Sequence, residues 1–178
     1  WNPVEELKLE QNGGETKLLD WDATVKLNLL PLLAKDGHSI HSLSTQLTFA
    51  DQQSDNFDYW FRPSTSRLAM KNDYKGEASR TYSKYRQHSL EWLGNYAMEL
   101  KGHRARAMVG YSYQYFQNSG LNAANKDFSS DGLLYNNLGS GEWAKEEGRN
   151  EMGTNKSDSK LIAFFGRLSY DYKNRYLM

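Results

Sequence analysis

Alternation between apolar and polar residues is the dominant pattern along this chain. The clearest example runs from Arg104 to Phe116, where every second residue from Ala105 to Tyr115 is apolar or aromatic. The residues between them are more polar and include Arg106. Successive side chains of a β-strand point to opposite faces of its sheet, so this period of two predicts a strand with one apolar and one polar face.

Four further segments show the same period, which brings the prediction to five strands of about 10–14 residues each. Their alternating positions span Trp21–Leu29, His41–Phe49, Leu90–Leu100 and Ile162–Tyr172. The pattern is weakest in the second of these predicted strands, where His41 and Thr45 stand at positions of the apolar face. No segment predicts a long helix, so the fold class indicated by the sequence is all-β.

The connections between the predicted strands alternate between short and long. The short ones are Pro31–His38, Lys101–His103 and Lys173–Arg175, and the long ones are residues 51–86 and 117–158. Consecutive strands joined in this way are expected to be antiparallel, with every short turn at one end of the sheet and both long loops at the other.

Three features favour a membrane barrel over a soluble sandwich or a lipocalin-like barrel, which also alternate. The predicted strands reach the about 9–11 residues that a membrane-spanning strand needs. Short turns at one end and long loops at the other are typical of outer-membrane barrels. Aromatic residues near the strand ends, such as Trp21, Tyr113 and Tyr170, suit the headgroup region of a bilayer. We therefore predict a segment of an antiparallel transmembrane β-barrel.

A soluble secreted β-sandwich or barrel that binds carbohydrate is the alternative interpretation. The composition at first favours it, because only 38% of the residues are hydrophobic and the mean hydropathy is −0.83. In a membrane barrel, however, only alternate strand residues face lipid, and polar loops dilute them further. Low mean hydropathy therefore does not exclude the membrane interpretation.

Charge and residue content exclude several other classes of protein. Basic and acidic residues balance at 22 each, which argues against nucleic-acid binding. The absence of cysteine excludes disulfides, thiolate zinc sites and a cysteine nucleophile. Asp127 and Asp131 begin like a calcium-binding loop, but Leu138 stands where the bidentate glutamate is needed, so an Asx-rich turn is expected there. No cofactor, metal site or enzymatic activity is predicted.

Five strands alone do not close a barrel. Bacterial single-chain barrels have an even number of strands, eight or more. An open sheet would expose two unpaired edges, which the bilayer interior does not tolerate. The predicted segment therefore needs partner strands, and we expect it to be a piece of a longer barrel.

Two segments carry a resemblance to a known family. Residues 102–116, GHRARAMVGYSYQYF, resemble the KHNLNALLGYEYQ strand of the SusC/RagA-type TonB-dependent outer-membrane transporters. Residues 160–177, KLIAFFGRLSYDYKNRYL, are similar to the FGRVNYNYKDRYL segment of that family, and this second match is the more specific. Arg104-Ala105-Arg106 departs from the family's Asn-Leu-Asn but keeps the alternation.

This resemblance implies that residues 1–178 form one mid-barrel slice, with five of about 22 strands. The signal peptide, TonB box and plug of the family are expected to lie outside the slice. Family members sit in the outer membrane of Bacteroidota and import glycans or peptides with energy from the TonB complex. A SusD-like lipoprotein covers the barrel as a lid. The implied partners are this lid, the TonB complex, outer-membrane lipid and a glycan or peptide substrate.

Aromatic residues of the two long loops are the candidates for contact with substrate or lid, because flat rings stack on sugars and also serve peptides. These candidates are Tyr59, Trp60, Tyr135 and Trp143. The alternative is that the rings pack the loops on themselves, as long loops often require.

The strands supply a second set of candidates, divided between the two faces. The predicted lipid-facing residues are Ala105, Ala107, Val109, Tyr111, Tyr113, Leu168 and Tyr170. The predicted lumen-facing residues are Arg106, Glu91, Arg167 and Asp171. The second group would either line a water-filled path or form cross-strand ion pairs within the barrel wall.

Overall fold

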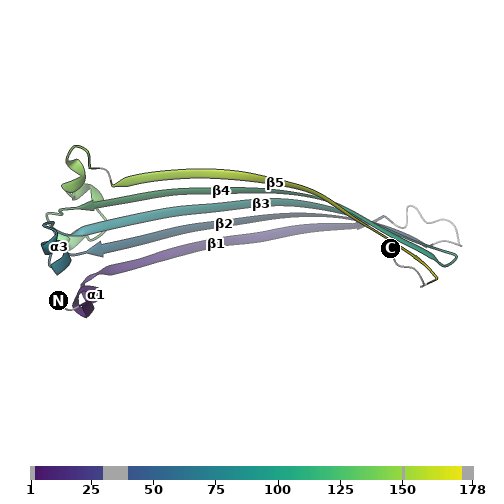
Figure 1. Cartoon of the computed structure of the whole chain (residues 1–178), viewed down its shortest axis with the longest axis horizontal. Coiled ribbons are helices and arrows are strands. Elements are labelled where there is room, and N and C mark those ends of the chain that lie inside the picture. The colour runs from purple at the N-terminus through teal and green to yellow at the C-terminus, as the bar shows by residue number, and fades with distance from the viewer. Residues whose placement is uncertain (1–2, 30–39, 150, 174–178) are drawn as a thin grey trace. The chain divides into compact units, whose positions relative to one another are not determined.

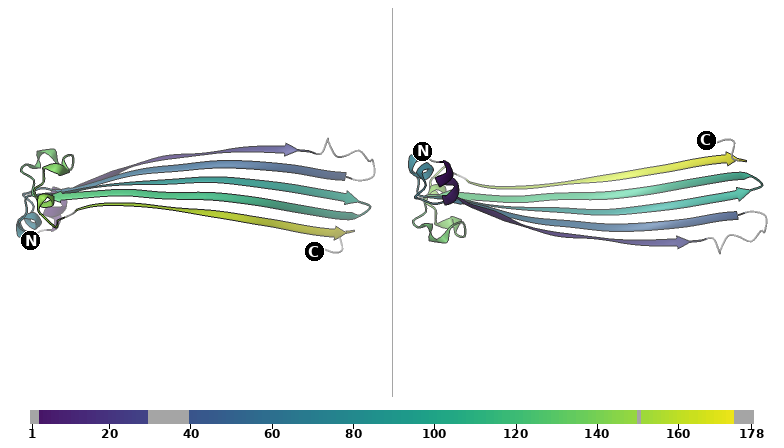
Figure 2. Two further views of the ribbon diagram at one scale, coloured as in Figure 1. Left: turned by 90° about the horizontal axis from the view of Figure 1, so that it is seen from above. Right: turned by 90° about the horizontal axis from the view of Figure 1, so that it is seen from below.

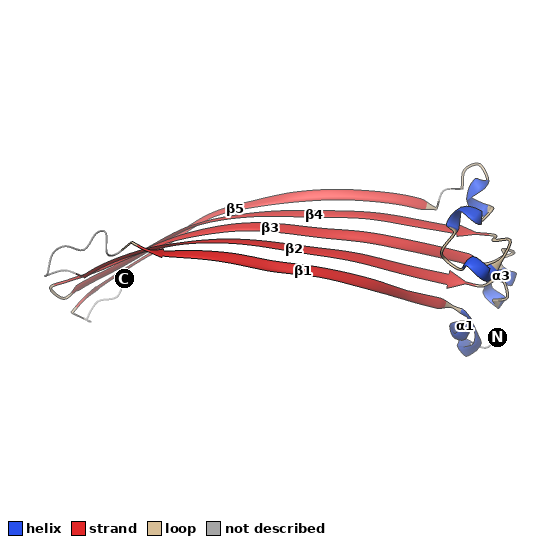
Figure 3. Ribbon diagram, turned by 180° about the vertical axis from the view of Figure 1, so that it is seen from behind, coloured by secondary structure: helices blue, strands red, loops and turns tan. Residues whose placement is uncertain are grey.

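The fold is described by a computed structural model, which covers residues 3–29, 40–149 and 151–173. These residues form one five-stranded sheet in which each strand pairs with its neighbours in the sequence (Figures 1 and 3). The strands are β1 (Gln11–Asn28), β2 (Ile40–Arg62), β3 (Glu77–Leu100), β4 (His103–Lys126) and β5 (Met152–Tyr172). The prediction of an all-β antiparallel sheet is therefore confirmed.

Short helical elements accompany the strands. They are α1 (Pro3–Leu9), α3 (Arg67–Lys71) and three single 3-10 turns at Asp131–Leu133, Leu138–Ser140 and Trp143–Lys145. All of them gather beside the same strand ends (Figure 2). No helix in the described part of the chain is long and apolar enough to cross a membrane.

The strands are longer than the sequence pattern predicted, with 18 to 24 residues each. β2 continues to Arg62 and β3 begins at Glu77, so most of the predicted loop 51–86 is strand. β4 likewise continues to Lys126, and β5 begins at Met152 within the predicted loop 117–158. The predicted loop bounds were wrong because these segments lack a regular alternation of apolar and polar residues, whereas backbone pairing requires no such alternation.

The turn between β3 and β4 contains only two residues, Lys101 and Gly102. Both have positive φ angles, 49° and 85°. Such backbone angles at both positions match the right-handed twist of a tight hairpin, and glycine adopts them without steric cost. Of the other two predicted short turns, Pro31–His38 lies outside the described residues, and only Lys173 of the last one is described. The Lys173 N–H donates to the Gly102 carbonyl at 2.8 Å.

The chain divides into two compact units. Unit 1 contains residues 1–18, 53–85 and 117–157, and unit 2 contains residues 19–52, 86–116 and 158–178. Among the described residues, the buried apolar core belongs to unit 1, where Phe61, Ala78 and Phe128 pack together. In unit 2 many large apolar side chains are exposed, among them Val109, Phe164 and Leu168. Each unit is therefore considered separately below.

Candidate functional site

Contacts across the strands of unit 2 show which side chains share a face. The rings of Tyr111 and Phe164 have centroids 5.1 Å apart, and those of Trp21 and Phe49 are 5.4 Å apart. Each pair joins predicted apolar positions of neighbouring strands. We call the face that carries these four residues the apolar face, and the opposite side of unit 2 the polar face.

The apolar face of unit 2 is unusually exposed. Phe164 is 80% exposed, Leu168 75% and Val109 52%. Soluble monomers rarely leave a contiguous apolar surface of this kind in water. The face therefore requires an apolar surrounding.

Histidine–tyrosine pairs mark the end of the apolar face near the Lys101–Gly102 turn. Nδ1 of His103 lies 2.6 Å from the Tyr170 hydroxyl. Nδ1 of His41 lies 2.8 Å from the Tyr96 hydroxyl on the other side of the hairpin. Rings with one polar end suit a boundary between an apolar and an aqueous layer.

Polar side chains also form a row across the opposite end of the apolar face. Nδ1 of His88 lies 2.5 Å from Oδ2 of Asp51, and the His88 ring stacks on Tyr115 with centroids 6.1 Å apart. Lys160 Nζ lies 6.0 Å from the Tyr115 ring centroid. From His103 to Tyr115 along β4 is about 40 Å at the usual rise of a strand. At a tilt of about 45°, this length spans about 28 Å, close to the thickness of a bilayer's hydrocarbon core.

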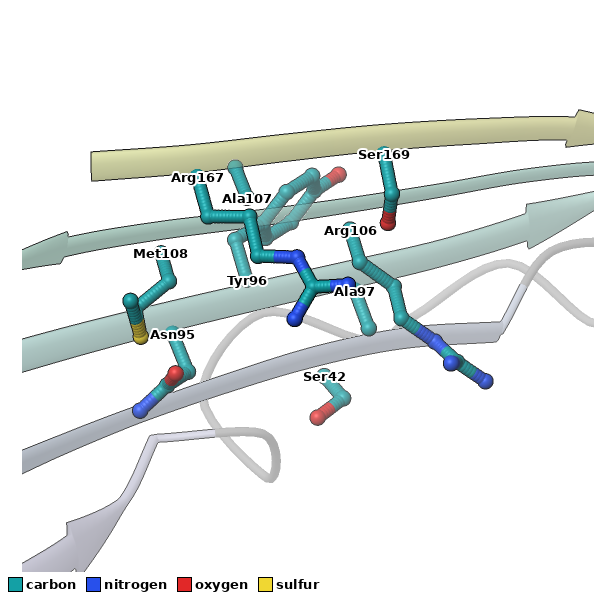
Figure 4. A pocket seen from close by; sticks show the side chains of 9 residues that line it. All are labelled: Ser42, Asn95, Tyr96, Ala97, Arg106, Ala107, Met108, Arg167 and Ser169. Atoms are coloured by element: carbon teal, nitrogen blue, oxygen red, sulfur yellow. The ribbon is translucent and has the colours of Figure 1, made fainter. Parts of the chain in front are cut away.

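The polar face of unit 2 carries a cavity of about 280 Å³. The side chains of Arg106 and Arg167 lie on this side of the sheet, whereas Ala107 points to the opposite side (Figure 4). Asp171 lines a neighbouring cavity together with Arg104 and Arg106. Glu91, also assigned to this face by the sequence, is exposed on β3.

In unit 1, five alternating charges form a row across the strand ends, which we call the charged row. Arg62 Nη2 lies 2.7 Å from Oε1 of Glu10, and Arg62 Nη1 lies 3.2 Å from Oε2 of Glu77. Lys126 Nζ lies 3.4 Å from Oε1 of Glu77 and 3.6 Å from Oε1 of Glu151. Each base therefore sits between two carboxylates.

The partly buried bases of the charged row remain protonated. Burial lowers the pKa of Arg62, but hydrogen bonds to Glu10 and Tyr74 outweigh it, so this pKa is raised. Burial also lowers the pKa of Lys126, but the carboxylates of Glu77 and Glu151 raise it by more. The row is consequently an ion-pair network rather than a set of proton donors.

Two of the four aromatic loop candidates adjoin the charged row. The guanidinium of Arg62 lies 4.6 Å from the centroid of Trp60. The centroid of the Trp143 ring lies 5.1 Å from Lys126 Nζ and 3.6 Å from the Arg149 guanidinium. Both tryptophans thus use their faces to hold cations of the protein itself.

The other two candidates, Tyr59 and Tyr135, stack on each other with centroids 3.8 Å apart. Tyr135 also packs against the core of Phe61, Ala78 and Phe128. Burial and then the neighbouring Tyr59 raise the pKa of Tyr135. Tyr59 and Trp60 are adjacent in β2 and so point to opposite faces. The structure therefore pairs Tyr59 with Tyr135, places Trp60 and Trp143 beside different cations, and does not assemble the four candidates into one site.

The loop that begins like a calcium site holds two connections together instead. Both carboxylate oxygens of Asp131 accept from the Ser64 N–H at 3.1 Å, and Oδ2 also accepts from the Ser64 hydroxyl at 2.8 Å. Oδ1 of Asp127 accepts from the Lys75 N–H at 2.8 Å. No group of three or more metal-ligating side chains occurs among the described residues. The contacts described above for Asp127 and Asp131 therefore join this loop to residues distant in the sequence, and they differ from the local bonds of the Asx-rich turn that the sequence predicted.

The charged row was missed by the sequence analysis. Its five residues lie in five separate segments, so no local motif predicts the charged row. One signal was available, because Glu77 and Lys126 stand the same number of residues from the Lys101–Gly102 turn. A two-residue hairpin places such positions opposite each other.

This geometry has counterparts among known proteins. No protein-family model matches the sequence. The chain is 28% identical over 102 residues to TonB-dependent receptor P3 of Formosa agariphila, which covers 57% of the chain and 10% of that receptor. It superposes on the RagAB peptide transporter with a TM-score of 0.59, and on the closed-closed and open-open states of the RagAB peptide importer with TM-scores of 0.63 and 0.64. The resemblance to SusC/RagA-type TonB-dependent transporters is confirmed.

The solved RagAB chains are 16% identical to this chain and cover 93–94% of it, which establishes the fold over nearly its whole length. The chain spans 17% of each of those chains and a tenth of the curated receptor. Its fold is that of a segment of the β-barrel of these transporters, and in sequence it is similar to a TonB-dependent receptor. The proteins it resembles are a receptor and transporters rather than enzymes.

Proposed function

We propose that this segment forms part of the wall of a TonB-dependent importer of glycans or peptides, which works with a SusD-like surface lipoprotein. In this proposal the apolar face contacts outer-membrane lipid and the polar face lines the interior of the barrel. Residues 63–76 and 127–151 then lie on the extracellular side. Energy would come from the TonB complex through parts of the protein outside this segment.

The observation that carries the proposal is the exposed apolar face, bounded at both ends by rows that contain histidine and tyrosine. Its extent of about 28 Å suits the hydrocarbon layer, and the polar rows suit the two headgroup regions. A soluble carbohydrate-binding module would need another element to cover Phe164 and Leu168. Such a cover would be redundant in a bilayer, where lipid supplies it.

Peptides are favoured over glycans as the imported solute. The support is that the solved structures with the same fold are described as a peptide transporter and a peptide importer. In addition, the four aromatic residues that suggested sugar stacking already contact other side chains of the segment. Each ring therefore already has a partner within the segment.

Growth of a deletion strain tests the proposal. A strain that lacks the full-length gene should fail to grow on a peptide mixture as its sole nitrogen source, and the wild-type gene should restore growth. Growth on ammonium is the control, because it needs no importer. Normal growth of the deletion strain on peptides, together with failure on a polysaccharide, would instead identify a glycan importer. Normal growth on both would contradict an import function.

A further inference from the structure

We propose that the cavity between Arg106 and Arg167 binds a carboxylate group of the imported solute. This inference rests on the proposed function, because it assumes that the polar face lines the water-filled interior of the barrel. The cavity has a volume of about 280 Å³. The side chains of Ser42, Asn95 and Ser169 lie on the same side of the sheet as the two guanidinium groups (Figure 4).

The lining of this cavity carries positive charge without a compensating acid. None of its nine lining residues is an aspartate or a glutamate. Within the described ranges, neither Arg106 nor Arg167 forms an ion pair. Arg104, two residues along β4, differs from them because its Nε lies 3.5 Å from Oε1 of Glu99. The two cavity arginines are therefore available to an external anion.

Strand pairing explains why the two arginines line the same cavity. The ring contact of Tyr111 with Phe164 sets the register of β4 and β5, and counting from it places Arg167 opposite Met108. Arg106 is then the diagonal neighbour of Arg167 on the same face, at a separation that long side chains bridge easily. Two cations that line one cavity repel each other, and an anion between them offsets the repulsion.

The donor set suits a carboxylate. Guanidinium groups stay charged at physiological pH and present paired N–H donors that match the two oxygens of a carboxylate. The hydroxyls of Ser42 and Ser169 and the amide of Asn95 add neutral donors at the rim. A volume near the lower limit of ligand sites fits the end of a longer solute rather than the whole of it. The carboxyl terminus of a peptide has this chemistry and this size.

The test compares a free peptide terminus with a blocked one. The full-length transporter, purified in detergent, is titrated with dansyl-triglycine and with its C-terminal amide, and binding is followed by fluorescence anisotropy. The wild type should bind the acid about tenfold or more tightly than the amide. Arg106→Gln and Arg167→Gln should each remove most of that preference. Arg167→Lys keeps the charge but loses the paired donors, so it should retain part of the preference.

Lys26→Gln on β1 is the matched control, because it removes the same charge from an exposed strand position outside the cavity. It should leave the preference for the acid unchanged. Each variant is first checked for folding by its heat-dependent mobility on a gel. Equal affinity of the wild type for acid and amide would overturn the proposal. The same loss in Lys26→Gln would also overturn it, since general charge attraction would then suffice.

Thermal unfolding without the peptide shows whether the two arginines bind an external solute or pair with an acidic residue of the same polypeptide. The proposal expects similar melting temperatures for Lys26→Gln, Arg106→Gln and Arg167→Gln in the absence of peptide. Lower values in the two cavity variants, combined with no peptide binding by the wild type, would reveal an internal ion pair and overturn the proposal. The binding assay does not depend on import. If the wild type showed no preference for the acid over the amide but still supported growth on peptides, only the cavity assignment would be contradicted.

Discussion

Oε2 of Glu77 lies 3.2 Å from Nη1 of Arg62 on the neighbouring strand. The other oxygen of this carboxylate reaches Lys126 on the opposite neighbour, at 3.4 Å. Glu77 is thus the central member of the charged row, and its side chain is only 20% exposed. Partial burial makes these pairs stronger than surface ion pairs, and it makes the loss of one partner costly.

Glu77→Gln should lower the free energy of unfolding of the barrel by about 1–2 kcal/mol, because Arg62 and Lys126 each lose a carboxylate while remaining partly buried. Guanidinium-induced unfolding of the full-length protein in detergent, followed by tryptophan fluorescence, measures the change. Glu146→Gln is the control, since it breaks a pair with Arg149 in which Glu146 is 62% exposed. That change should cost no more than about 0.5 kcal/mol. Equal effects of the two substitutions would contradict a special role for the charged row.

Alkaline pH should weaken the charged row through Lys126. The pKa of Lys126 is raised in the folded protein, so its stabilising contribution is complete below the unfolded value of about 10.4 and disappears as pH rises through the folded value. The wild type should therefore lose more stability than Lys126→Gln between about pH 10 and pH 12. Unfolding midpoints of both proteins at pH 8, 10 and 12 measure this difference. Parallel losses in the two proteins would show that Lys126 is not responsible.

Adjacent residues of β4 provide the sharpest test of the lipid and lumen assignments. Val109→Arg places a charge in the middle of the apolar face, halfway between His103 and Tyr115, and should cost about 2–4 kcal/mol in the full-length barrel. Met108→Arg places the same side chain on the polar face, in the lining of the Arg106 cavity, and should cost much less. The fraction folded into lipid vesicles, read from heat-dependent gel mobility, compares them. If Met108→Arg is the more damaging change, the two faces have been assigned the wrong way round.

Gly110 has no room for a side chain. A Cβ at this position would collide with the ring of Phe165 on the neighbouring strand. Gly110→Ala should therefore destabilise the barrel by about 1–3 kcal/mol. Adding Phe165→Ala to the same protein should recover part of this loss, because it removes the obstructing ring. Gly139→Ala is the control, since its Cβ would meet only Asn137 at an ordinary 3.7 Å. An additive effect of the two substitutions at Gly110 and Phe165 would contradict the collision.

The sequence predicted the faces of unit 2 better than the lengths of the strands. The apolar residues from Ala105 to Tyr115 carry the period of two directly, because lipid or a core must cover them. Beyond Asp51 in β2 and before Lys160 in β5, serine, asparagine and charged residues occupy both faces. Backbone hydrogen bonds extend those strands, and the alternation of side chains does not predict such bonds.

For the candidate sites, too, the sequence predicted the face of a residue but not its partners. Arg106 and Arg167 could be placed on one face by counting residues, but their convergence on a cavity depends on the register between β4 and β5. The stacking of Tyr59 on Tyr135 brings together a strand and a loop separated by more than seventy positions. Long-range pairing of this kind is set by the fold as a whole and leaves no local trace in the sequence.

The β3–β4 hairpin has a safeguard that apolar alternation cannot provide. A slip of two residues between these strands would leave every side chain on its proper face, so lipid would not penalise it. It would, however, part Glu77 from Lys126 at one end and Glu99 from Arg104 at the other. The turn at Lys101–Gly102 would also have to reopen. The ion pairs at the two ends of the hairpin thus disfavour a two-residue shift in register that contact with lipid would not disfavour.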